Sequence, residues 1–292
     1  MCQPTGGRGS RRPEKSQTLL QTRPHGRKVQ GYQTVIIERA SQEDFSSLKQ
    51  LWSTVFSEDP VFLEHFFSTR FASEHIFVAR KDCNIVSALH ALPAHYLQHG
   101  AIKPCSFIVG AATYVEYRKQ GIMGALLAAT KRAYDHPITL FPAVRPFYEA
   151  HGYFTTSSVL SFSLEDVVPS SDVPIPIEYS QLDSLYRAEH DQSGCLLRDE
   201  EAWKFLTEGY QTLCVENGYA FISEGKAVEA CATSKTAATR LLALLAGHAV
   251  SEVHALENSF IAMSLNRQKA VPIPMGMSTD KAMQGVYIAE QY

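Results

Sequence analysis

The sequence lacks several features that would assign a protein to a functional class at once. Its six cysteines form no Cys-x-x-Cys pair, and no Cys/His spacing would close a zinc site. No apolar run is long enough to span a membrane or to serve as a signal peptide. A net charge of −3 gives no reason to expect nucleic acid as the main partner. These absences predict a cytoplasmic protein with free thiols, no metal, no nucleic-acid partner and no membrane association.

What the chain does have is enough apolar material for one large domain or two ordinary ones, since 45% of its 292 residues are hydrophobic. The charge is unevenly placed, because residues 1–34 hold seven Lys or Arg against Glu14 alone. Residues 1–33 are therefore predicted to be a disordered basic leader, either a solvated tail or an extension from an upstream start codon. An arm that binds nucleic acid or a membrane surface is the alternative.

The most informative run extends from Tyr117 to Leu127, after the apolar segment 106–113 and at the start of a predicted helix. The first N–H groups of a helix have no partner within it, and the helix dipole adds partial positive charge there. Gly121 and Gly124 lack the Cβ atom that would keep a ligand away from the backbone. The run predicts a phosphate or pyrophosphate site, and an ordinary helix start is the simpler alternative.

The segments that follow carry a family resemblance. A second apolar strand is predicted at 138–143, followed by Pro-Phe-Tyr-Glu-Ala-His-Gly-Tyr-Phe at 146–154. This order resembles the GNAT superfamily of acyl-CoA-dependent N-acetyltransferases, whose loop reads Arg/Gln-x-x-Gly-x-Gly/Ala and whose later helix carries Phe-Tyr-Glu-x-x-Gly-Phe/Tyr. The positions that match are Arg118, Gly121, Phe147, Tyr148, Glu149, Gly152 and Tyr153. Met123 departs from the pattern, because the family has a small residue there and this chain places its glycine at 124.

The resemblance implies an α/β (α+β) fold, with a mixed central sheet flanked by helices. Strands are predicted at 34–39, 75–80, 85–96 and 106–113, and helices at 41–55 and 61–71. Residues 34–165 would form the catalytic GNAT domain. The proline-containing segment 166–178 suits a linker.

A smaller second domain is expected at 179–292. Helices at 181–190, 200–210 and 239–249, with a strand pair around Gly225, repeat the order of the first half. The position equivalent to the phosphate loop, 233–238, has no glycine, so this half is interpreted as a degenerate GNAT-like domain that shapes a substrate cleft. Two-part chains of this kind look like the branch related to the enhanced intracellular survival acetyltransferases.

The chemistry of acetyl transfer can be stated from first principles. An amine that attacks a thioester creates an oxyanion and then expels a thiolate, so the site needs an N–H donor near the carbonyl and an acid near the sulfur. The resemblance assigns the main chain of Ala112, Thr113 and Tyr114 to the pantetheine and thioester. It makes Tyr148 the proton donor, for which an aromatic core residue is the alternative. It implies that the pyrophosphate binds at Arg118, Lys119, Gln120, Gly121, Ile122, Met123 and Gly124.

The general base is left open by the sequence. His90, His95 and His99 cluster on a predicted strand and its hairpin, and Glu116 lies beside the loop. The C-terminal carboxylate of Tyr292 is a further candidate by resemblance, or the amine arrives already deprotonated.

The reaction implied is transfer of an acetyl group from acetyl-CoA to a primary amine, by direct attack in a ternary complex. The acceptor would be a small molecule or a peptide, no metal would be needed, and a homo-oligomer is left open. Two alternatives remain, a noncatalytic CoA-binding or scaffold protein and an acyltransferase that uses a longer acyl group.

Overall fold

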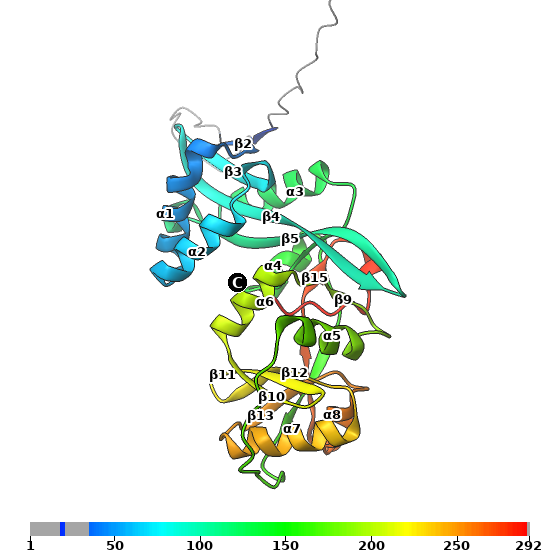
Figure 1. Cartoon of the computed structure of the whole chain (residues 1–292). Coiled ribbons are helices and arrows are strands. Elements are labelled where there is room, and N and C mark those ends of the chain that lie inside the picture. Colours follow the sequence, from blue (N-terminus) through cyan, green and yellow to red (C-terminus); the bar gives the residue numbers. More distant parts are fainter. Residues whose placement is uncertain (1–17, 21–34, 291–292) are drawn as a thin grey trace, which may run out of the picture. The chain divides into compact units, whose positions relative to one another are not determined.

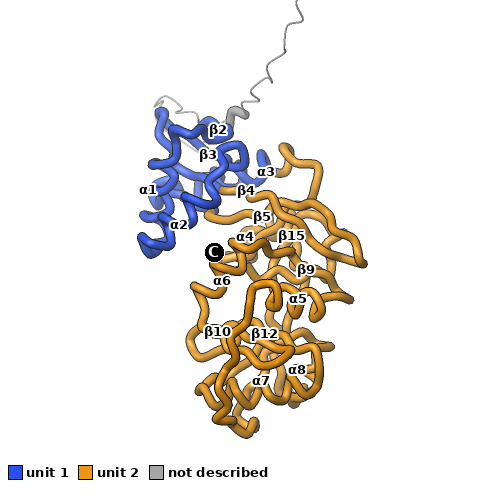
Figure 2. Tube along the Cα trace, viewed as in Figure 1, with its two compact units in different colours: residues 1–89, 111–130 blue, residues 90–110, 131–292 orange. Residues whose placement is uncertain are grey.

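The computed structural model describes residues 18–20 and 35–290. The chain divides into a first unit, residues 1–89 with 111–130, and a second unit, residues 90–110 with 131–292 (Figure 2). The predicted leader lies outside the described residues, except for strand β1 (Thr18–Leu20). The two units divide the chain at residues 89/90, 110/111 and 130/131, so they do not test the predicted domain boundaries at 165 and 178, which stay a prediction.

The first unit combines a helix pair with strands. Strand β2 (Val35–Arg39) pairs antiparallel with β3 (Ile76–Lys81). Helices α1 (Phe45–Phe56) and α2 (Pro60–Arg70) lie near the predicted ranges and pack through aromatic rings, with Trp52 stacked on Phe66 at 4.6 Å. A capping box precedes α1, because the carboxylate of Asp44 accepts hydrogen bonds from the N–H (2.7 Å) and hydroxyl (3.0 Å) of Ser41.

Two long strands, β4 (Asn84–Gln98) and β5 (Ala101–Thr113), contribute residues to both units. They belong to a sheet with the order β1-β2-β3-β4-β5-β6-β15-β7, in which β9 (Cys195–Leu196) pairs with β4. Helix α3 (Ile122–Ala133) follows β5, as the loop assignment requires (Figure 1). The predicted order from strand to turn to helix is therefore observed.

The far end of this sheet is built from short strands of the second unit. They are β6 (Ile138–Leu140), β7 (Phe154–Thr155) and β15 (Met277–Ser278). Strand β15 pairs antiparallel with both β6 and β7, so two residues near the chain's C-terminal end complete a sheet that begins with β1. Helix α4 (Arg145–Ala150) stands between β6 and β7 in the sequence and is shorter than the predicted segment.

A second sheet has the order β10-β11-β12-β13-β8-β14. Its strands are β8 (Ser158–Ser163), β10 (Gln211–Val215), β11 (Gly218–Ser223), β12 (Lys226–Ala232), β13 (Glu252–Ala255) and β14 (Val271–Pro274). The helices of this part are α5 (Tyr179–Glu189), α6 (Glu200–Gly209), α7 (Lys235–Gly247) and α8 (Phe260–Met263). The leucines of α7 pack on this sheet in one apolar core. The predicted fold class, mixed α/β with sheets flanked by helices, is confirmed.

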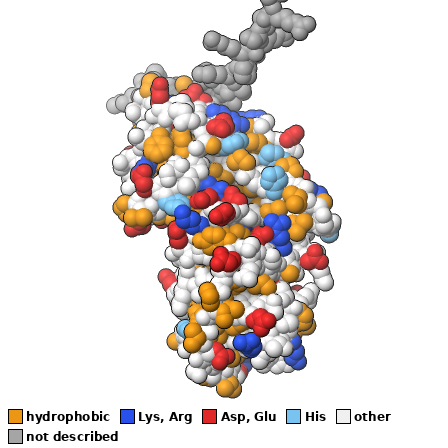
Figure 3. Space-filling model, in the orientation of Figure 1, with side chains coloured by type: hydrophobic (Ala, Val, Ile, Leu, Met, Phe, Trp, Pro, Cys, Tyr) orange, Lys and Arg blue, Asp and Glu red, His pale blue; other side chains and the backbone are white. Residues whose placement is uncertain are grey.

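The five described cysteines are free, and all of them except Cys83 are buried. Acidic and basic side chains are interspersed on the face drawn in Figure 3. In the part of the chain that the structure describes, no helix is both long and apolar enough to cross a bilayer.

Candidate functional site

The turn between β5 and α3 carries the predicted phosphate loop. Lys119 has a φ of 60° and Gly121 a φ of 77°, and the second value favours glycine. The first helical bond runs from the N–H of Ala125 to the carbonyl of Gly121 at 3.1 Å. The N–H groups of residues 122–124 precede that bond and form the open start of the helix. No atom lies within 4 Å of the place where a Cβ on Gly121 would stand, so the turn is open to a ligand.

Two side chains of the loop donate hydrogen bonds to nearby main-chain carbonyls. The Nε of Arg118 donates to the carbonyl of Thr113 at 3.0 Å, which ties the loop to the end of β5. The Nε2 of Gln120 donates to the carbonyl of Glu116, also at 3.0 Å. Arg118, Lys119 and Gln120 are all exposed. The loop is thus fixed by local bonds while positive charge remains at its surface.

The end of β5 supplies the predicted main-chain groups. Ala112 is buried, and its carbonyl accepts a hydrogen bond from the hydroxyl of Ser87 at 2.8 Å. The N–H of Tyr114 donates to the carbonyl of Val86 at 3.1 Å. That N–H is therefore committed to β4, whereas Ala112 and Thr113 remain candidates for the thioester.

Strand β5 extends beyond its neighbour β6. The two strands pair in parallel from Ser106↔Ile138 to Ile108↔Leu140. Strand β6 ends at Leu140, whereas β5 continues to Thr113 and contains Gly110 at a φ of 61°. The backbone of residues 109–113 therefore has an edge that β6 does not cover, which suits main-chain hydrogen bonding to an extended ligand.

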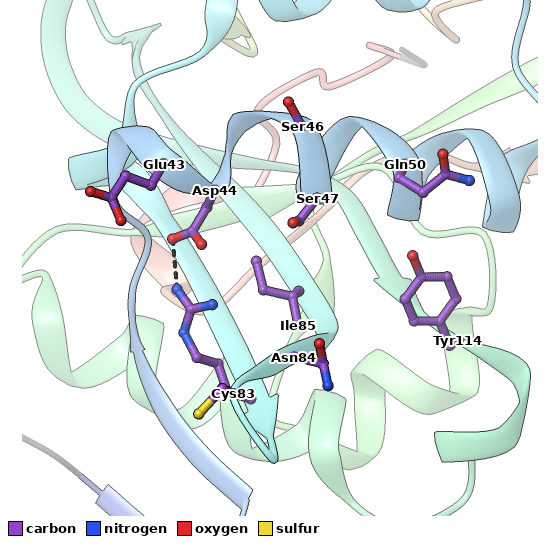
Figure 4. A pocket seen from close by; sticks show the side chains of 10 residues that line it. Glu43, Asp44, Ser46, Ser47, Gln50, Cys83, Asn84, Ile85 and Tyr114 are labelled. Carbon is purple, nitrogen blue, oxygen red and sulfur yellow. Dashed lines mark hydrogen bonds and ion pairs between the residues drawn. The ribbon is translucent and has the colours of Figure 1, made fainter.

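A polar cavity of about 570 Å³ lies in the first unit, between α1 and the turn from β3 to β4 (Figure 4). Two of the charged residues that line it form an ion pair, Arg80 with Asp44 at 2.6 Å, and Arg80 also contacts Glu38 at 2.7 Å. Burial alone would raise the pKa of Asp44, but the hydrogen bonds from Arg80 and Ser41 lower it. Tyr114 also lines this cavity.

Tyr148 lies on α4 in the second unit, whereas the loop belongs to the first. Its side chain is 9% exposed and contacts Tyr153 edge-to-face, with ring centroids 5.8 Å apart. Burial raises the pKa of the Tyr148 phenol, so the hydroxyl keeps its proton at neutral pH. The carbonyl of Tyr148 accepts hydrogen bonds from the N–H groups of His151 (2.9 Å) and Tyr153 (3.1 Å). A fixed, protonated phenol is compatible with the acid role and also with packing.

The candidate general bases differ in how far solvent can reach them. His90 is 0% exposed, and burial lowers its pKa to about 3, so it is neutral and shielded from solvent. His95 is an exposed residue of β4, whereas His99 lies in the turn after β4, at a φ of 52°, and does not share a strand face with it. Glu116 is exposed beside the loop, and Tyr292 lies outside the described residues. No cluster of three His, Cys, Asp or Glu side chains that could hold a metal is found at 18–20 or 35–290.

A family model described as an acetyltransferase (GNAT) domain matches residues 37–155. Residues 37–155 are a GNAT acetyltransferase domain. The match begins in β2, contains the loop and α4, and ends at Thr155 of β7. The predicted GNAT domain is therefore confirmed for the matched residues.

Solved structures agree with the fold of the GNAT domain and extend the likeness to most of the chain. A conserved protein of unknown function from Enterococcus faecalis V583, described as a probable N-acyltransferase, is 20% identical with a TM-score of 0.64, covering 86% of this chain and 74% of that one. A GCN5-related N-acetyltransferase from Anabaena variabilis is 17% identical with a TM-score of 0.62, covering 84% and 72%. Eis1 from Mycobacterium abscessus is 12% identical with a TM-score of 0.54, covering 84% and 72%. A search of curated proteins gave no match.

Two arginines were missed by sequence reasoning. Arg145 begins α4 and bonds to three acceptors from other segments. Arg198 is buried between the carboxylates of Glu229 and Glu290. The hydrogen-bond partners of these arginines lie between 10 and 130 residues away in the sequence, so no short motif indicates either of them. The Pro-Phe-Tyr run directly after Arg145 was the one local signal near either of them.

Proposed function

We propose that this GNAT protein transfers an acetyl group from acetyl-CoA to a primary amine of a small molecule or peptide, by direct attack in a ternary complex. The observation that carries the proposal is the open start of α3, where Gly121 at positive φ precedes the N–H groups of residues 122–124. Such a helix start favours a pyrophosphate through hydrogen bonds and through the helix dipole. The proposed contacts run from Arg118 through Gly124.

Met123 and Gly124 bear on how closely the coenzyme approaches. Both residues lie in the first turn of α3 and are half-buried. A main-chain N–H donates whatever side chain its residue carries, so Met123 keeps its donor. We propose that the pyrophosphate is held mainly by these N–H groups, with Arg118 and Lys119 adding positive charge.

The proposed transfer step balances as follows. The amine nitrogen forms a bond to the acetyl carbon, the C–S bond breaks, and the electron pair leaves with sulfur. We propose that Tyr148 gives its proton to that thiolate and is reprotonated by solvent. The amine loses its own proton to water or to a base that has not been assigned, and the main chain of Ala112 or Thr113 would stabilise the oxyanion.

Thiol release from acetyl-CoA, followed with a panel of primary amines, tests the reaction. Tyr148→Phe is expected to lower kcat about 100-fold or more, because general acid catalysis contributes on that scale, and to leave the KM for acetyl-CoA within about twofold. Tyr134→Phe is a matched control, because it removes another hydroxyl of the same unit that is not assigned to the site. Equal loss of turnover and coenzyme binding in Tyr148→Phe would count against the acid role.

The second candidate function is a CoA-binding or scaffold protein without transfer activity. The observation in its favour is that His90, one of the candidate bases, is fully buried, so neither solvent nor an amine can reach it. Tight acetyl-CoA binding without thiol release to any amine, including at high pH where amines are deprotonated, would establish this alternative.

A further inference from the structure

Helix α4, which carries Tyr148, cannot set its own orientation. It has six residues, and its N-cap Val144 makes no side-chain capping bond. Isolated helices of this length are not stable in water, so the position of α4 is determined by bonds to other segments.

Arg145, the first residue of α4, supplies three of these bonds. One guanidinium nitrogen donates to the hydroxyl of Thr155 at 2.7 Å, and the other donates to the carbonyls of Pro274 (2.9 Å) and Met275 (2.7 Å). Hydrogen bonds from a charged donor are stronger than neutral ones, and the planar fork fixes direction as well as distance. Arg145 therefore joins the start of α4 to β7 and to the segment that leads into β15.

The acceptors of Arg145 are held rigidly. The N–H of Gly276 donates to the carbonyl of Ile288 at 3.0 Å, and the carbonyl of Gly276 accepts from the N–H of Thr156 at 2.9 Å. A Cβ on Gly276 would lie 2.5 Å from the side chain of Ile288, so the two segments are in close contact. Met277 then pairs with both Leu140 and Thr155. Arg145 is thus bonded to a fixed part of the second unit.

The other end of α4 has a separate anchor. The Nζ of Lys131 donates to the carbonyl of His151 at 2.8 Å, directly after the helix. Arg145 and Tyr148 are three residues apart, which places them on one face of the helix. A rotation or tilt at Arg145 would therefore move the phenol of Tyr148.

We propose that Arg145 is the residue that positions Tyr148, through its bonds to Thr155, Pro274 and Met275. The C-terminal segment thereby controls the placement of the acid, although it lies outside the matched GNAT domain. This inference rests on the proposed function, because it takes Tyr148 as the proton donor.

Steady-state kinetics of Arg145→Met test the catalytic part. We expect kcat to fall about tenfold or more, since a displacement of about 1 Å is enough for such a loss, with the KM for acetyl-CoA nearly unchanged. Added guanidinium is expected to restore part of the lost kcat, and Arg145→Lys is expected to keep part of it. Arg187→Met is the control, because it removes an arginine whose ion pair with Asp183 lies within α5, and its kcat should stay unchanged without a guanidinium effect.

Two further measurements separate this inference from the proposed function. In the Tyr148→Phe background, Arg145→Met should cause little additional loss of kcat. The reason is that Arg145 acts through the phenol of Tyr148, so both substitutions remove the same contribution to kcat. Amide hydrogen exchange at residues 146–152 should be faster in Arg145→Met than in the wild type, whether or not the protein transfers acetyl groups. A full additional loss in the double variant, or unchanged exchange, would overturn the proposal. Absence of transfer by the wild type would overturn the catalytic part, whereas faster exchange would still establish the tether.

Discussion

The two halves of the chain each contain a helix that follows a strand, and their first turns differ. Helix α3 is preceded by Gly121, which has no side-chain atom that could accept a hydrogen bond from the helix start. Helix α7 is preceded by Ser234, whose hydroxyl accepts from the N–H of Ala237 at 3.1 Å. A serine cap satisfies a free N–H group of the helix start from within the chain. The start of α7 is therefore capped by Ser234, whereas Gly121 offers no side-chain cap to the start of α3.

The charged residues differ in the same way. Arg118 and Lys119 are exposed beside α3, whereas the half-buried carboxylate of Glu189 accepts from the N–H of Ala232 at 3.4 Å, just before α7. Burial raises the pKa of Glu189 to about 7, although the hydrogen bond from Ala232 lowers it. The basic side chains of Arg118 and Lys119 are thus exposed at the turn before α3. The turn before α7 has the carboxylate of Glu189 beside it instead.

The largest expected effect is on the stability of the second half. The side chain of Arg198 is 1% exposed, contacts Glu229 at 2.6 Å and Glu290 at 2.9 Å, and stacks on the ring of Tyr186. Arg198→Met would leave two carboxylates buried without their partner, so we expect a loss of about 3–5 kcal/mol in the free energy of unfolding.

Urea unfolding measures this loss. Arg240→Met is the control, because Arg240 is half-exposed and lies 3.9 Å from Glu216, a surface pair expected to contribute less than about 1 kcal/mol. Similar losses in both variants would show that the buried cluster does not have the stabilising role assigned to it.

The next largest effect concerns the open turn itself. Gly121→Asp places a negative charge, and a side chain at positive φ, where the pyrophosphate is proposed to bind. We expect acetyl-CoA to bind about 30-fold more weakly or worse, a cost of about 2 kcal/mol, measured by isothermal titration. Ser234→Asp makes the matched change at α7 and should leave that affinity unaltered. Equal affinities for Gly121→Asp and the wild type would remove the loop from the binding site.

A smaller effect is expected from the titration of Glu189. Its pKa in the folded state is about 7, above the ordinary value of 4.5, so the folded protein holds the proton more tightly than the unfolded chain. Stability contributed by this group is therefore complete below about pH 4.5 and is lost as the pH rises towards 7.

Glu189→Gln should remove that contribution to the pH dependence, about 2 kcal/mol between pH 5 and pH 7.5, because glutamine does not titrate. The measurement is the difference between wild-type and variant stability at pH 5 and pH 7.5, in which the other titrating groups cancel. A constant difference across this range would mean that Glu189 titrates normally.

The smallest effect is expected at the capped helix. Ser234→Ala removes the acceptor for the N–H of Ala237 and should lower stability by about 1 kcal/mol. Thermal unfolding measures the change, and acetyl-CoA affinity should remain as in the wild type. A change in affinity would show that the start of α7 contributes to binding, against the comparison drawn above.

Local patterns predicted the long helices, the strands β2 to β6 and the hairpin at Gly225, because apolar spacing, the Ser41–Asp44 box and the turn glycines act within a few residues. The pairing of β15 with β6 and β7 was not predicted. A strand of two residues has no measurable period, and its partners lie more than 120 residues away. The pairing of β8 with β13 and β14 was also missed, because the partner strands lie about 90 to 116 residues further along the chain.

The candidate site was predictable where it is local. The loop and α4 carry contiguous motifs, whereas Arg145 depends on acceptors at Thr155, Pro274 and Met275 that only the folded chain brings to it. The commitment of the Tyr114 N–H to Val86 likewise depends on the register of β5 against β4. Contacts between distant segments leave no periodic signal in the sequence.

A thermal-shift titration with acetyl-CoA, free CoA and ATP tests the central claim most directly, because a ligand that binds only the folded state raises the unfolding midpoint with its concentration. The proposed site predicts a concentration-dependent rise with both CoA species and none with ATP. No rise with either CoA species would contradict the assignment of the α3 turn as a coenzyme site.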